Sequence, residues 1–389
     1  MPVQKSIIPD GVSNESERLV DQKKDSNMKR YRGKDMADRD LIRSAINNAA
    51  KHKKNRAEVK RVLADVEGHV DIIQRMILEE SYKPTPYRVF EVIDGVSGKH
   101  RIVSCPKFFP DQVLHWLAIL SAQEIFMHGM YEFVCGSIPN RGVHYGRKYV
   151  KKWIETDRKN TKYCAKLDIT KFYPSIDHDA LKAALRRKFK DQKLLWLFDT
   201  IIDSTESGLP IGNYTSQWLA NFLLQGLDHK IKEEMHVVHY MRYMDDMVLF
   251  GSNKKKLHAA VKRIAEEIAP LGLHLKRNWQ VFRVDYTDKS RKRRGRDVDF
   301  MGFRFFRDKT IMRKRISLRA RRLAARISKQ KNASFKQAAA MLSYMGWFKY
   351  SDSLGYYEKY IKPKINITKL KGVVSNENRK RNSPAEVHS

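Results

Sequence analysis

The chain has 389 residues, 42% of them hydrophobic, which is enough for two to three domains with apolar cores. Its 77 Lys and Arg residues exceed its 44 Asp and Glu residues, so the formal net charge is +33. A surplus of this size destabilises a compact fold by self-repulsion unless a polyanion balances it. We therefore expect nucleic acid as the partner, with an anionic membrane surface as the alternative.

The same composition excludes other protein classes. No run of eighteen or more apolar residues is present, so we expect no membrane-spanning helix. Of the two partner classes we therefore expect nucleic acid and no membrane. The N-terminus lacks the apolar core of a signal peptide. Cys105, Cys135 and Cys164 lie about thirty residues apart, which supports neither a zinc site nor a disulfide framework. A protein of the reducing cytoplasm is the simplest expectation.

In chain order, the first predicted elements are helices and a hairpin. Residues 1–30 are polar and charged, which predicts a disordered N-terminus. Apolar residues at helical spacing predict an N-terminal extension of two or three helices over residues 31–80. Alternating β-branched and aromatic residues then predict a hairpin over residues 87–104, with Lys99 and Arg101 on one face of its second strand.

The central part of the chain alternates between helix and strand patterns. The predicted helices cover residues 111–130, 179–188, 216–234 and 257–268, and the predicted strands cover residues 162–169 and 298–305, with a hairpin over 237–250. This mixture predicts an α+β fold with helices on one face of a small antiparallel sheet.

The segment 309–351 holds twelve Lys or Arg residues and no Asp or Glu. Its first helix is expected to pack one face and to meet phosphate with the other. The apolar stripe is Ile316, Ala320, Leu323, Ala324 and Ile327, and the basic stripe is Arg315, Arg319, Arg322, Arg326 and Lys329. A solvated charged face is the alternative, which the absence of compensating acids disfavours. Residues 371–389 are polar again and predict a disordered tail.

The most informative feature is the pair Asp245-Asp246, which stands at a break between two β-rich, apolar runs. Asp is disfavoured in strands and adjacent carboxylates repel each other, so a function must offset this cost. Divalent-metal binding is the obvious one, because Mg²⁺ takes hard carboxylate oxygens and leaves its other positions to water and phosphate. A surface turn that happens to contain two Asp residues is the alternative.

A second acidic position lies 77 residues before Asp245, where Asp168 ends an apolar strand. If the two segments are neighbours, Asp168 and Asp245 can share two Mg²⁺ ions about 4 Å apart. One ion would lower the pKa of a primer 3′-hydroxyl and the other would brace a triphosphate and its leaving oxygen. Ile169 could add only its backbone carbonyl as a further ligand. For Asp168 alone, a capping or turn role is the alternative.

Six ordered segments together resemble the motifs of reverse transcriptases, and the resemblance extends from about residue 87 to residue 360. They are the hairpin around Lys99 and Arg101, the Asp168 strand, residues 208–217 opening a helix, the box Tyr243-Met244-Asp245-Asp246, residues 271–276, and residues 300–303. The resemblance implies an RNA-directed DNA polymerase with the right-hand fold of that family. It implies fingers over residues 81–165, a palm with finger insertions over 166–306, and a basic helical thumb over 307–370.

The resemblance also implies the roles of the acidic residues. Asp168 and Asp245 would be catalytic metal ligands, with Asp246 as the adjacent acidic member and the Ile169 carbonyl as a further ligand. Two Mg²⁺ ions are the expected cofactors, for which Mn²⁺ can substitute. Lys276 is similar to the family lysine that acts as a general acid toward pyrophosphate.

Further positions are expected to bind substrate and nucleic acid. Lys99 and Arg101 suit a grip on the incoming triphosphate, which Arg101 can hold with two parallel hydrogen bonds. Tyr173 resembles the aromatic gate that excludes a ribose 2′-hydroxyl and so favours DNA synthesis; a core aromatic is the alternative. Gly212, with Ile211 and Gln217 in the same motif, would let the backbone approach the nascent base pair. Arg315, Arg319, Arg322 and Arg326 are expected to contact the nucleic acid.

The residues around Gly212 differ between branches of the family. Ile211 before Gly212 and the ending Ser216-Gln217 are similar to reverse transcriptases of diversity-generating retroelements, which copy a template repeat with errors at adenines. Retroviral and intron-encoded enzymes typically have Gln before the Gly and end in Ser-Pro. Retron and antiviral defence-associated enzymes are an alternative. The short stretch after residue 348 leaves no room for a maturase, endonuclease or RNase H domain, which counts against an intron protein.

A catalytically idle RNA-binding relative is the alternative from a different class, and the intact set of three carboxylates argues against it. The expected partners are an RNA template, its cDNA, dNTPs and a structured non-coding RNA, together with an accessory protein that docks on the basic surface. We expect a cytoplasmic protein encoded by a bacterium or a phage.

Overall fold

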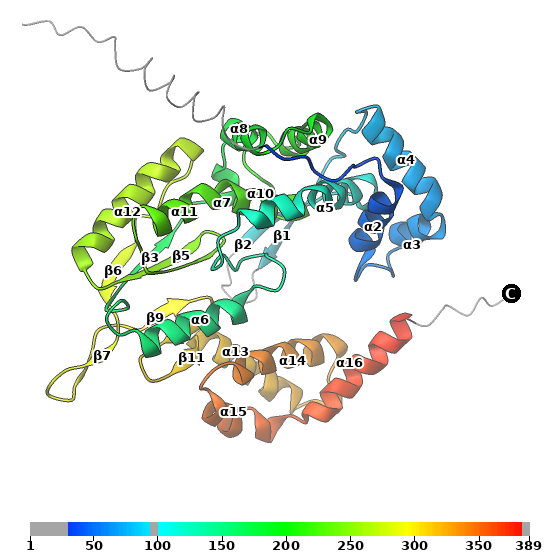
Figure 1. Cartoon of the computed structure of the whole chain (residues 1–389). Helices are drawn as coiled ribbons and strands as arrows, with labels where there is room; N and C mark the ends of the chain where they lie inside the picture. The colour runs from blue at the N-terminus through cyan, green and yellow to red at the C-terminus, as the bar shows by residue number, and fades with distance from the viewer. Residues whose placement is uncertain (1–29, 94–99, 383–389) are drawn as a thin grey trace, which may run out of the picture.

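The computed structural model of the protein describes residues 30–93 and 100–382 (Figure 1). The predicted disorder of residues 1–29 and the role assigned to Lys99 lie outside the described residues, as do residues 383–389. Within the two described ranges, no helix combines the length and the apolar character that crossing a bilayer requires.

The N-terminal extension contains the predicted helices. They are α2 (Arg39–Ala50), α3 (Ala57–Ala64) and α4 (Val66–Leu78). Asp38 caps α2 by accepting hydrogen bonds from the backbone N–H groups of Asp40 and Leu41. The buried residues of α2 recur at helical spacing and include Ile42, Ala45, Ile46 and Ala49. This buried face packs against α4 and against α5 (Val113–His128).

The predicted basic hairpin is also present. It consists of β1 (Arg88–Ile93) and β2 (His100–Cys105), paired antiparallel with Val92 opposite Arg101. Every side chain of β1 is exposed, so the hairpin projects from the body of the protein.

In the described part of the chain, the central sheet has four antiparallel strands in the order β4-β5-β3-β6. These are β3 (Tyr163–Asp168), β4 (His239–Tyr243), β5 (Asp246–Gly251) and β6 (Gln280–Arg283). The strand that ends in Asp168 therefore lies beside the hairpin that carries Asp245 and Asp246. The sequence did not show whether these two segments are neighbours. The pairing of β3 with β5 shows that they are.

Helices occupy the segments before and between these strands. They are α6 (Val143–Thr156), α7 (Phe172–Ser175), α8 (His178–Lys188), α9 (Gln192–Ile202), α10 (Tyr214–Leu223), α11 (Gln225–Glu233) and α12 (Lys254–Ile268). The prediction of one helix over residues 216–234 is wrong, because the chain leaves helical geometry at Leu224, with φ −90° and ψ 0°. Leu223 and Leu227 are both buried, so both helices contribute to the core.

Strict alternation along the strands sorts side chains onto two faces of the sheet. Leu167 and Met247 lie on a face that belongs to the largest apolar core, over which α12 packs. Cys164 and Val248 lie on the opposite face, in a second core with α6. The prediction of helices on one face of the sheet is therefore wrong, because the apolar side of α6 covers the other face. Asp168 lies an even number of residues after Cys164 on β3, so its side chain lies on this second face.

Two smaller sheets follow the central one. β7 (Tyr286–Thr287) pairs with β8 (Arg293–Arg294), while β9 (Val298–Phe300), β10 (Phe303–Phe305) and β11 (Thr310–Met312) pair in the order β11-β10-β9. The prediction of one strand over residues 298–305 is wrong, because the chain reverses at Met301 and Gly302, with φ 49° and 85°. A Cβ at Gly302 would lie 2.6 Å from the Trp347 ring, so only glycine fits.

The C-terminal helices pack around a core of their own (orange to red in Figure 1). They are α13 (Lys314–Ile327), α14 (Phe335–Lys349), α15 (Leu354–Tyr360) and α16 (Ile367–Asn382). The predicted apolar stripe of α13 is buried except for the half-buried Leu323. The predicted disordered tail from residue 371 is wrong as far as Asn382. Leu370 is buried in this core and Val373 and Val374 pack against it, which holds α16 in place.

Candidate active site

Three carboxylates meet at one end of the central sheet. Asp168 is the last residue of β3 and pairs directly with Asp246, the first residue of β5. Asp245 precedes it, in the turn that follows β4. All three side chains line one cavity of about 430 Å³. The structure thus brings together acidic residues that are 77 positions apart in the sequence.

Basic side chains line the same cavity. Arg101 reaches it from β2, and Lys166 lies two residues before Asp168 on the same face of β3. The Lys166 ammonium donates a hydrogen bond of 2.6 Å to the carbonyl oxygen of Asp299. Arg313 pairs with the Asp299 carboxylate. These fixed cations make the cavity suitable for a polyanionic substrate that enters between the carboxylates and the basic rim.

Mutual repulsion and burial perturb the carboxylates. Burial first, and then the charges of Asp246 and Asp168, raise the pKa of Asp245 from 3.8 to about 6, while Lys276 opposes the change. The pKa of Asp246 is also raised, by burial first and by Asp168 second. Ionising several buried carboxylates close to one another costs free energy, and a bound cation would offset this cost.

The donor set fits a hard divalent cation. Carboxylate and carbonyl oxygens are the ligands that such ions prefer, and Mg²⁺ commonly takes only one or two carboxylates and completes its shell with water and phosphate. Within residues 30–93 and 100–382, no group of three or more His, Cys, Asp and Glu side chains is arranged to hold a metal ion by itself. Water and substrate oxygens would have to complete a coordination shell that these carboxylates begin.

The backbone around Ile169 agrees with its predicted role. Ile169 forms an antiparallel bridge with Leu275, flanked by hydrogen bonds from Lys276 N–H to the Asp168 carbonyl and from Thr170 N–H to the His274 carbonyl, each 2.8 Å long. In this pattern the carbonyl of Ile169 points away from Leu275, toward the side of β3 on which β5 lies. Its role as a metal ligand stays a prediction.

Lys276 contacts one of the three carboxylates directly. Its Nζ lies 2.5 Å from Asp168 Oδ1, and the two side chains are 30% and 27% exposed. The contact is an ion pair without hydrogen-bond alignment, because Oδ1 is buried with no hydrogen-bond partner. The bridge between Ile169 and Leu275 places the lysine beside the aspartate. The lysine is thus within reach of any group that Asp168 binds.

The turn that presents Asp245 has a strained backbone. Met244, the first of its two residues, has φ 55°, a left-handed conformation that costs a non-glycine residue about 1–3 kcal/mol. Gly136 lies against this turn, and a Cβ at Gly136 would lie 2.7 Å from the backbone nitrogen of Met244. The surrounding structure must hold Met244 in this conformation.

A fully buried polar network beneath the turn supplies that hold. Arg242 on β4 donates to both carboxylate oxygens of Asp228 on α11, at 2.8 and 2.6 Å, and both side chains are 0% exposed. The same guanidinium donates to Asn221 Oδ1 at 2.9 Å and to the carbonyl oxygen of Met244 at 3.2 Å. Asn221 in turn donates to the carbonyl of Gly136 at 2.9 Å. One arginine therefore ties the catalytic turn to α10 and α11.

Reasoning from the sequence missed this network. A signal was present, because Arg242 interrupts a run of aromatic and apolar residues in a strand, and an arginine in a buried strand requires an acidic partner. The sequence contains many acids, and only the fold selects Asp228.

The predicted substrate residues divide into two groups. Arg101 lines the catalytic cavity. Tyr173 is half-buried, and burial raises its pKa. The charge of Asp245 raises this pKa further and that of Arg101 lowers it, so Tyr173 is close enough to the cavity to feel both charges. Ile211 and Gly212 instead lie against β2, where the Ile211 carbonyl accepts a hydrogen bond of 2.8 Å from Ser104 N–H.

The glycines of this motif allow close approach of protein backbone. A Cβ at Gly212 would clash with the carbonyl oxygen of Ser104, and one at Gly208 would lie 2.5 Å from Pro174 Cα. Both glycines have positive φ, at 128° and 63°. The close approach of Ser104 is a structural reason for glycine at position 212. The further role of Gly212, to admit the nascent base pair, stays a prediction. Gln217 is exposed on α10, and its substrate role also stays a prediction.

The predicted basic stripe continues from the cavity along α13. Arg313, which lines the cavity, directly precedes this helix. Arg315, Arg322 and Arg326 are exposed and Arg319 is half-buried. A nucleic-acid strand that leaves the carboxylates in this direction would meet cations along the helix.

Comparison with known proteins identifies the family. The sequence model of the family described as "Reverse transcriptase (RNA-dependent DNA polymerase)" matches residues 92–305, more than half of the chain. The chain belongs to this family. The sheet that carries the three carboxylates is therefore the palm of a right-hand polymerase fold, and the predicted α+β class is confirmed. The exact borders of fingers, palm and thumb stay predictions. Members of the family use divalent metal ions, in agreement with the donor set found here.

Individual relatives are distant. The retron Ec73 reverse transcriptase of Escherichia coli is 28% identical over 204 residues, which cover 48% of this chain and 61% of that enzyme. Protein YkfC of Escherichia coli strain K12 is 22% identical over 321 residues, covering 72% of this chain and 79% of YkfC. The chain thus spans about three fifths of the length of the retron enzyme.

Solved telomerase structures are also similar in part. Telomerase from Candida albicans with a TWJ fragment of telomeric RNA gives a TM-score of 0.44 at 10% identity, covering 79% of this chain and 62% of that one. Apo telomerase from Candida tropicalis gives 0.44 at 12% identity, covering 77% and 58%.

Proposed function

We propose that the protein copies an RNA template into DNA by nucleotidyl transfer. The observation that carries the proposal is the direct pairing of Asp168 with Asp246 across neighbouring palm strands, with Asp245 in the adjoining turn. Three carboxylates that line one cavity together with basic side chains suit the transfer of a charged phosphoryl group, for which positioning and charge neutralisation supply most of the catalysis.

Asp168, Asp245 and Asp246 would hold two Mg²⁺ ions, with Mn²⁺ as a substitute and the Ile169 carbonyl as a further ligand. When bound, these ions lower the pKa of the primer 3′-hydroxyl and stabilise charge on the triphosphate. The raised pKa of Asp245 supports this assignment, because cation binding favours the ionised form. The identity of the ion is part of the proposal.

The remaining cavity residues handle the nucleotide. Arg101 binds the triphosphate through the two parallel donors of its guanidinium. Lys276 lies beside Asp168 and donates a proton to the leaving pyrophosphate. Tyr173 closes the sugar pocket next to Asp245 and excludes the 2′-hydroxyl of ribonucleotides.

Primer extension tests the proposal. The purified protein, an RNA template with an annealed DNA primer, dNTPs and Mg²⁺ should give cDNA, and Asp245→Ala should give none. Asp199→Ala is the matched control, because Asp199 is a surface acid on α9, paired with Arg186, and should leave extension unchanged. An unchanged product from Asp245→Ala refutes the assigned site. RNA binding without extension by the parent, on any primer and template, supports the alternative of a catalytically idle RNA-binding relative.

The branch of the family has two candidates. Ile211 before Gly212 and Gln217 at the end of the motif support a diversity-generating retroelement, whose enzyme makes error-prone cDNA from a template repeat. The similarity to the retron Ec73 enzyme supports the second candidate, a retron-type or anti-phage defence reverse transcriptase. Sequencing the cDNA separates them, because errors concentrated at template adenines favour the first and evenly spread errors favour the second.

The proposed partners follow from the activity. They are the RNA template and its cDNA, dNTPs, a structured non-coding RNA, and an accessory protein on the basic surface, in the cytoplasm of a bacterium. The formal charge of +33 supports a polyanionic partner.

A further inference from the structure

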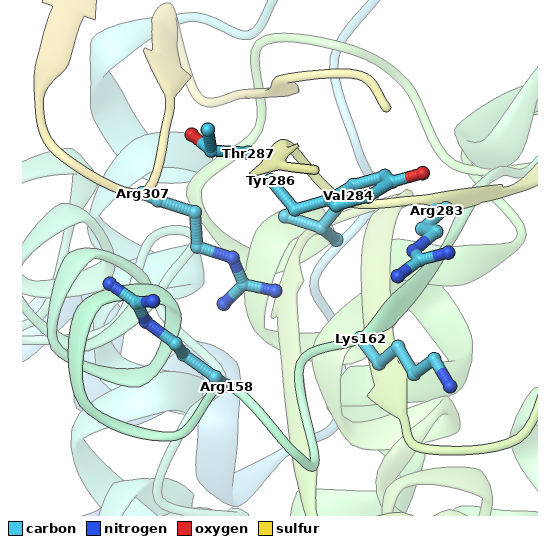
Figure 2. Close-up of a pocket in the computed structure, with 7 residues that line it drawn as sticks. All are labelled: Arg158, Lys162, Arg283, Val284, Tyr286, Thr287 and Arg307. Atoms are coloured by element: carbon cyan, nitrogen blue, oxygen red, sulfur yellow. The ribbon is translucent and has the colours of Figure 1, made fainter. Parts of the chain in front are cut away.

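A second basic cavity lies outside the active site. It has a volume of about 270 Å³ and is lined by Arg158, Lys162, Arg283, Val284, Tyr286, Thr287 and Arg307 (Figure 2). Arg158 and Lys162 come from the segment between α6 and β3, and Arg283 ends β6. The lining contains four cations and no carboxylate, and it shares no residue with the catalytic cavity.

Arg307 builds the wall of this cavity. Its guanidinium donates to the backbone carbonyls of Asp285, Ile154 and Thr161, at 2.7 to 2.9 Å. Burial lowers the pKa of Arg307, and the charge of Arg158 lowers it further. Figure 2 shows the guanidinium groups of Arg158 and Arg307 near each other. The cavity thus holds positive charges that repel one another.

The nearest acids are already engaged. Asp285 is buried and accepts two hydrogen bonds from Arg293, at 2.6 and 2.5 Å. Asp157 pairs with His239 at 2.8 Å and accepts hydrogen bonds from Asn160. Over the described ranges 30–93 and 100–382, none of Arg158, Lys162 and Arg283 forms an ion pair with a carboxylate. An anion from outside the chain is the natural partner for these three charges.

The site is held in shape by stacking. The guanidinium of Arg283 lies 3.6 Å from the centroid of the Tyr286 ring, which fixes its plane while its donors remain available. An arginine fork presented in this way matches the oxygens of a phosphate group.

The β7–β8 hairpin extends the positive surface beyond the cavity. Its connecting loop exposes Lys289, Arg291 and Lys292. The loop is ordered, because Asp288 accepts hydrogen bonds from Ser290 Oγ and from the backbone N–H of Lys292. Cavity and loop together form what we name the outer palm site, with seven cations on neighbouring segments: Arg158, Lys162, Arg283, Lys289, Arg291, Lys292 and Arg307.

The outer palm site lies far from the chemistry. Lys162 immediately precedes β3 and Asp168 ends it, so about six residues of extended chain, or roughly 20 Å, separate them. The site also lies on different elements from the basic stripe of α13. A nucleic acid bound here would therefore contact a part of the protein distinct from the primer-template cleft.

We propose that the outer palm site binds the phosphate backbone of an RNA segment held outside the primer-template cleft. This deepens the proposed function, on which it rests only for the choice of RNA as the polyanion. A concave pocket with a stacked arginine suits individual phosphate groups of a folded strand. A flat anionic membrane could not enter it, and the hairpin has none of the large exposed apolar side chains found among the described residues.

The test compares two triple variants of the full chain. The outer palm variant is Arg158→Ala/Lys162→Ala/Arg283→Ala, and the matched control is Lys254→Ala/Lys255→Ala/Lys256→Ala, which removes three equally exposed charges from the start of α12. Binding of a stem-loop RNA that carries no primer is measured by fluorescence anisotropy over a salt series. The outer palm variant should bind about tenfold more weakly, with the slope of log K against log salt reduced by about 2 to 3, and the control should change little.

Two further measurements keep the outcome decisive. Thermal melting should change little, because the three replaced side chains are exposed and make no ion pairs within the described ranges, and the stacking of Arg283 on Tyr286 is a weak surface contact. Extension of a short, pre-annealed primer-template should also be unchanged in the outer palm variant. The two proposals can fail separately, because an absence of extension by the parent would refute the proposed function and would leave the RNA-binding role of the outer palm site to be judged from the anisotropy. Equal RNA affinities and slopes in the two variants overturn the inference. Binding of the parent to anionic vesicles that is lost in the outer palm variant, with RNA binding intact, overturns it in favour of a membrane.

Discussion

Replacing Asp228 by Ala tests the role of the buried network under the catalytic turn. Asp228 is the only carboxylate among the described residues that contacts Arg242, and both side chains are fully buried. The variant leaves the arginine charge in the core without a counter-ion. Removing one partner of a buried pair costs about 3–5 kcal/mol in free energy of unfolding. Tyr240 also loses the acceptor of its 2.8 Å hydrogen bond, which adds about 1 kcal/mol.

Denaturant titration at fixed pH measures this loss. Asp199→Ala provides the control, because the Asp199–Arg186 pair lies at the surface and contributes at most about 1 kcal/mol. A loss from Asp228→Ala no larger than that of the control would refute the reasoning.

The double variant Asp228→Leu/Arg242→Met separates stability from positioning. Exchanging both charges for apolar groups should recover most of the lost stability. The carbonyl of Met244 still loses its donor, so the turn that carries Asp245 is no longer fixed. Because small displacements of reacting groups are costly, primer extension should fall by about a hundredfold despite the recovered fold. Extension at the parental rate would show that Arg242 does not position the turn.

Three further predictions concern charge, sugar selection and backbone geometry. Folding raises the pKa of Asp245 from 3.8 to about 6, so between these pH values the metal-free native state binds more protons than the unfolded state and loses about 3 kcal/mol of stability as the pH rises. Asp245→Asn should abolish this loss in denaturant titrations without divalent ions. An unchanged dependence of stability on pH would contradict the assignment. Tyr173→Ala should raise the kcat/KM for ribonucleotides relative to deoxynucleotides, whereas an unchanged ratio would exclude the gate. Gly208→Ala should lower stability by about 1–3 kcal/mol, because φ is 63° and the new Cβ would meet Pro174, and a parental melting temperature would contradict this.

Much of the fold followed from local patterns. The helical spacing of residues such as Ile42 and Ile46 reflects the buried face of α2, and the β-branched and aromatic residues of β1 and β2 favour extended, paired strands. Both kinds of information lie in neighbouring residues. The errors fell where the chain bends within a favourable pattern. Leu224 and Met301 interrupt predicted elements because packing and a neighbouring glycine decide the local backbone, which hydrophobic periodicity does not record.

The candidate site divides in the same way. Asp168, Asp245 and Asp246 could be chosen from the sequence because carboxylates at strand ends are costly without a ligand. Lys276 could be named through the family resemblance, but its contact with Asp168 could not. That contact, the pairing of Asp228 with Arg242, and the grouping of Arg158 with Arg283 join residues distant in the chain, so only the fold shows them.

The sequence by itself determined the chemistry, since residue types and their order specify a polyanion-binding chain with a pair of strand-end carboxylates. Only the tertiary structure decided how that chemistry is held. Strand pairing sets Asp168 opposite Asp246, and the helices bring a buried arginine under a strained turn. Such contacts depend on the global packing of the chain, because a charge can be buried only where the fold places its partner.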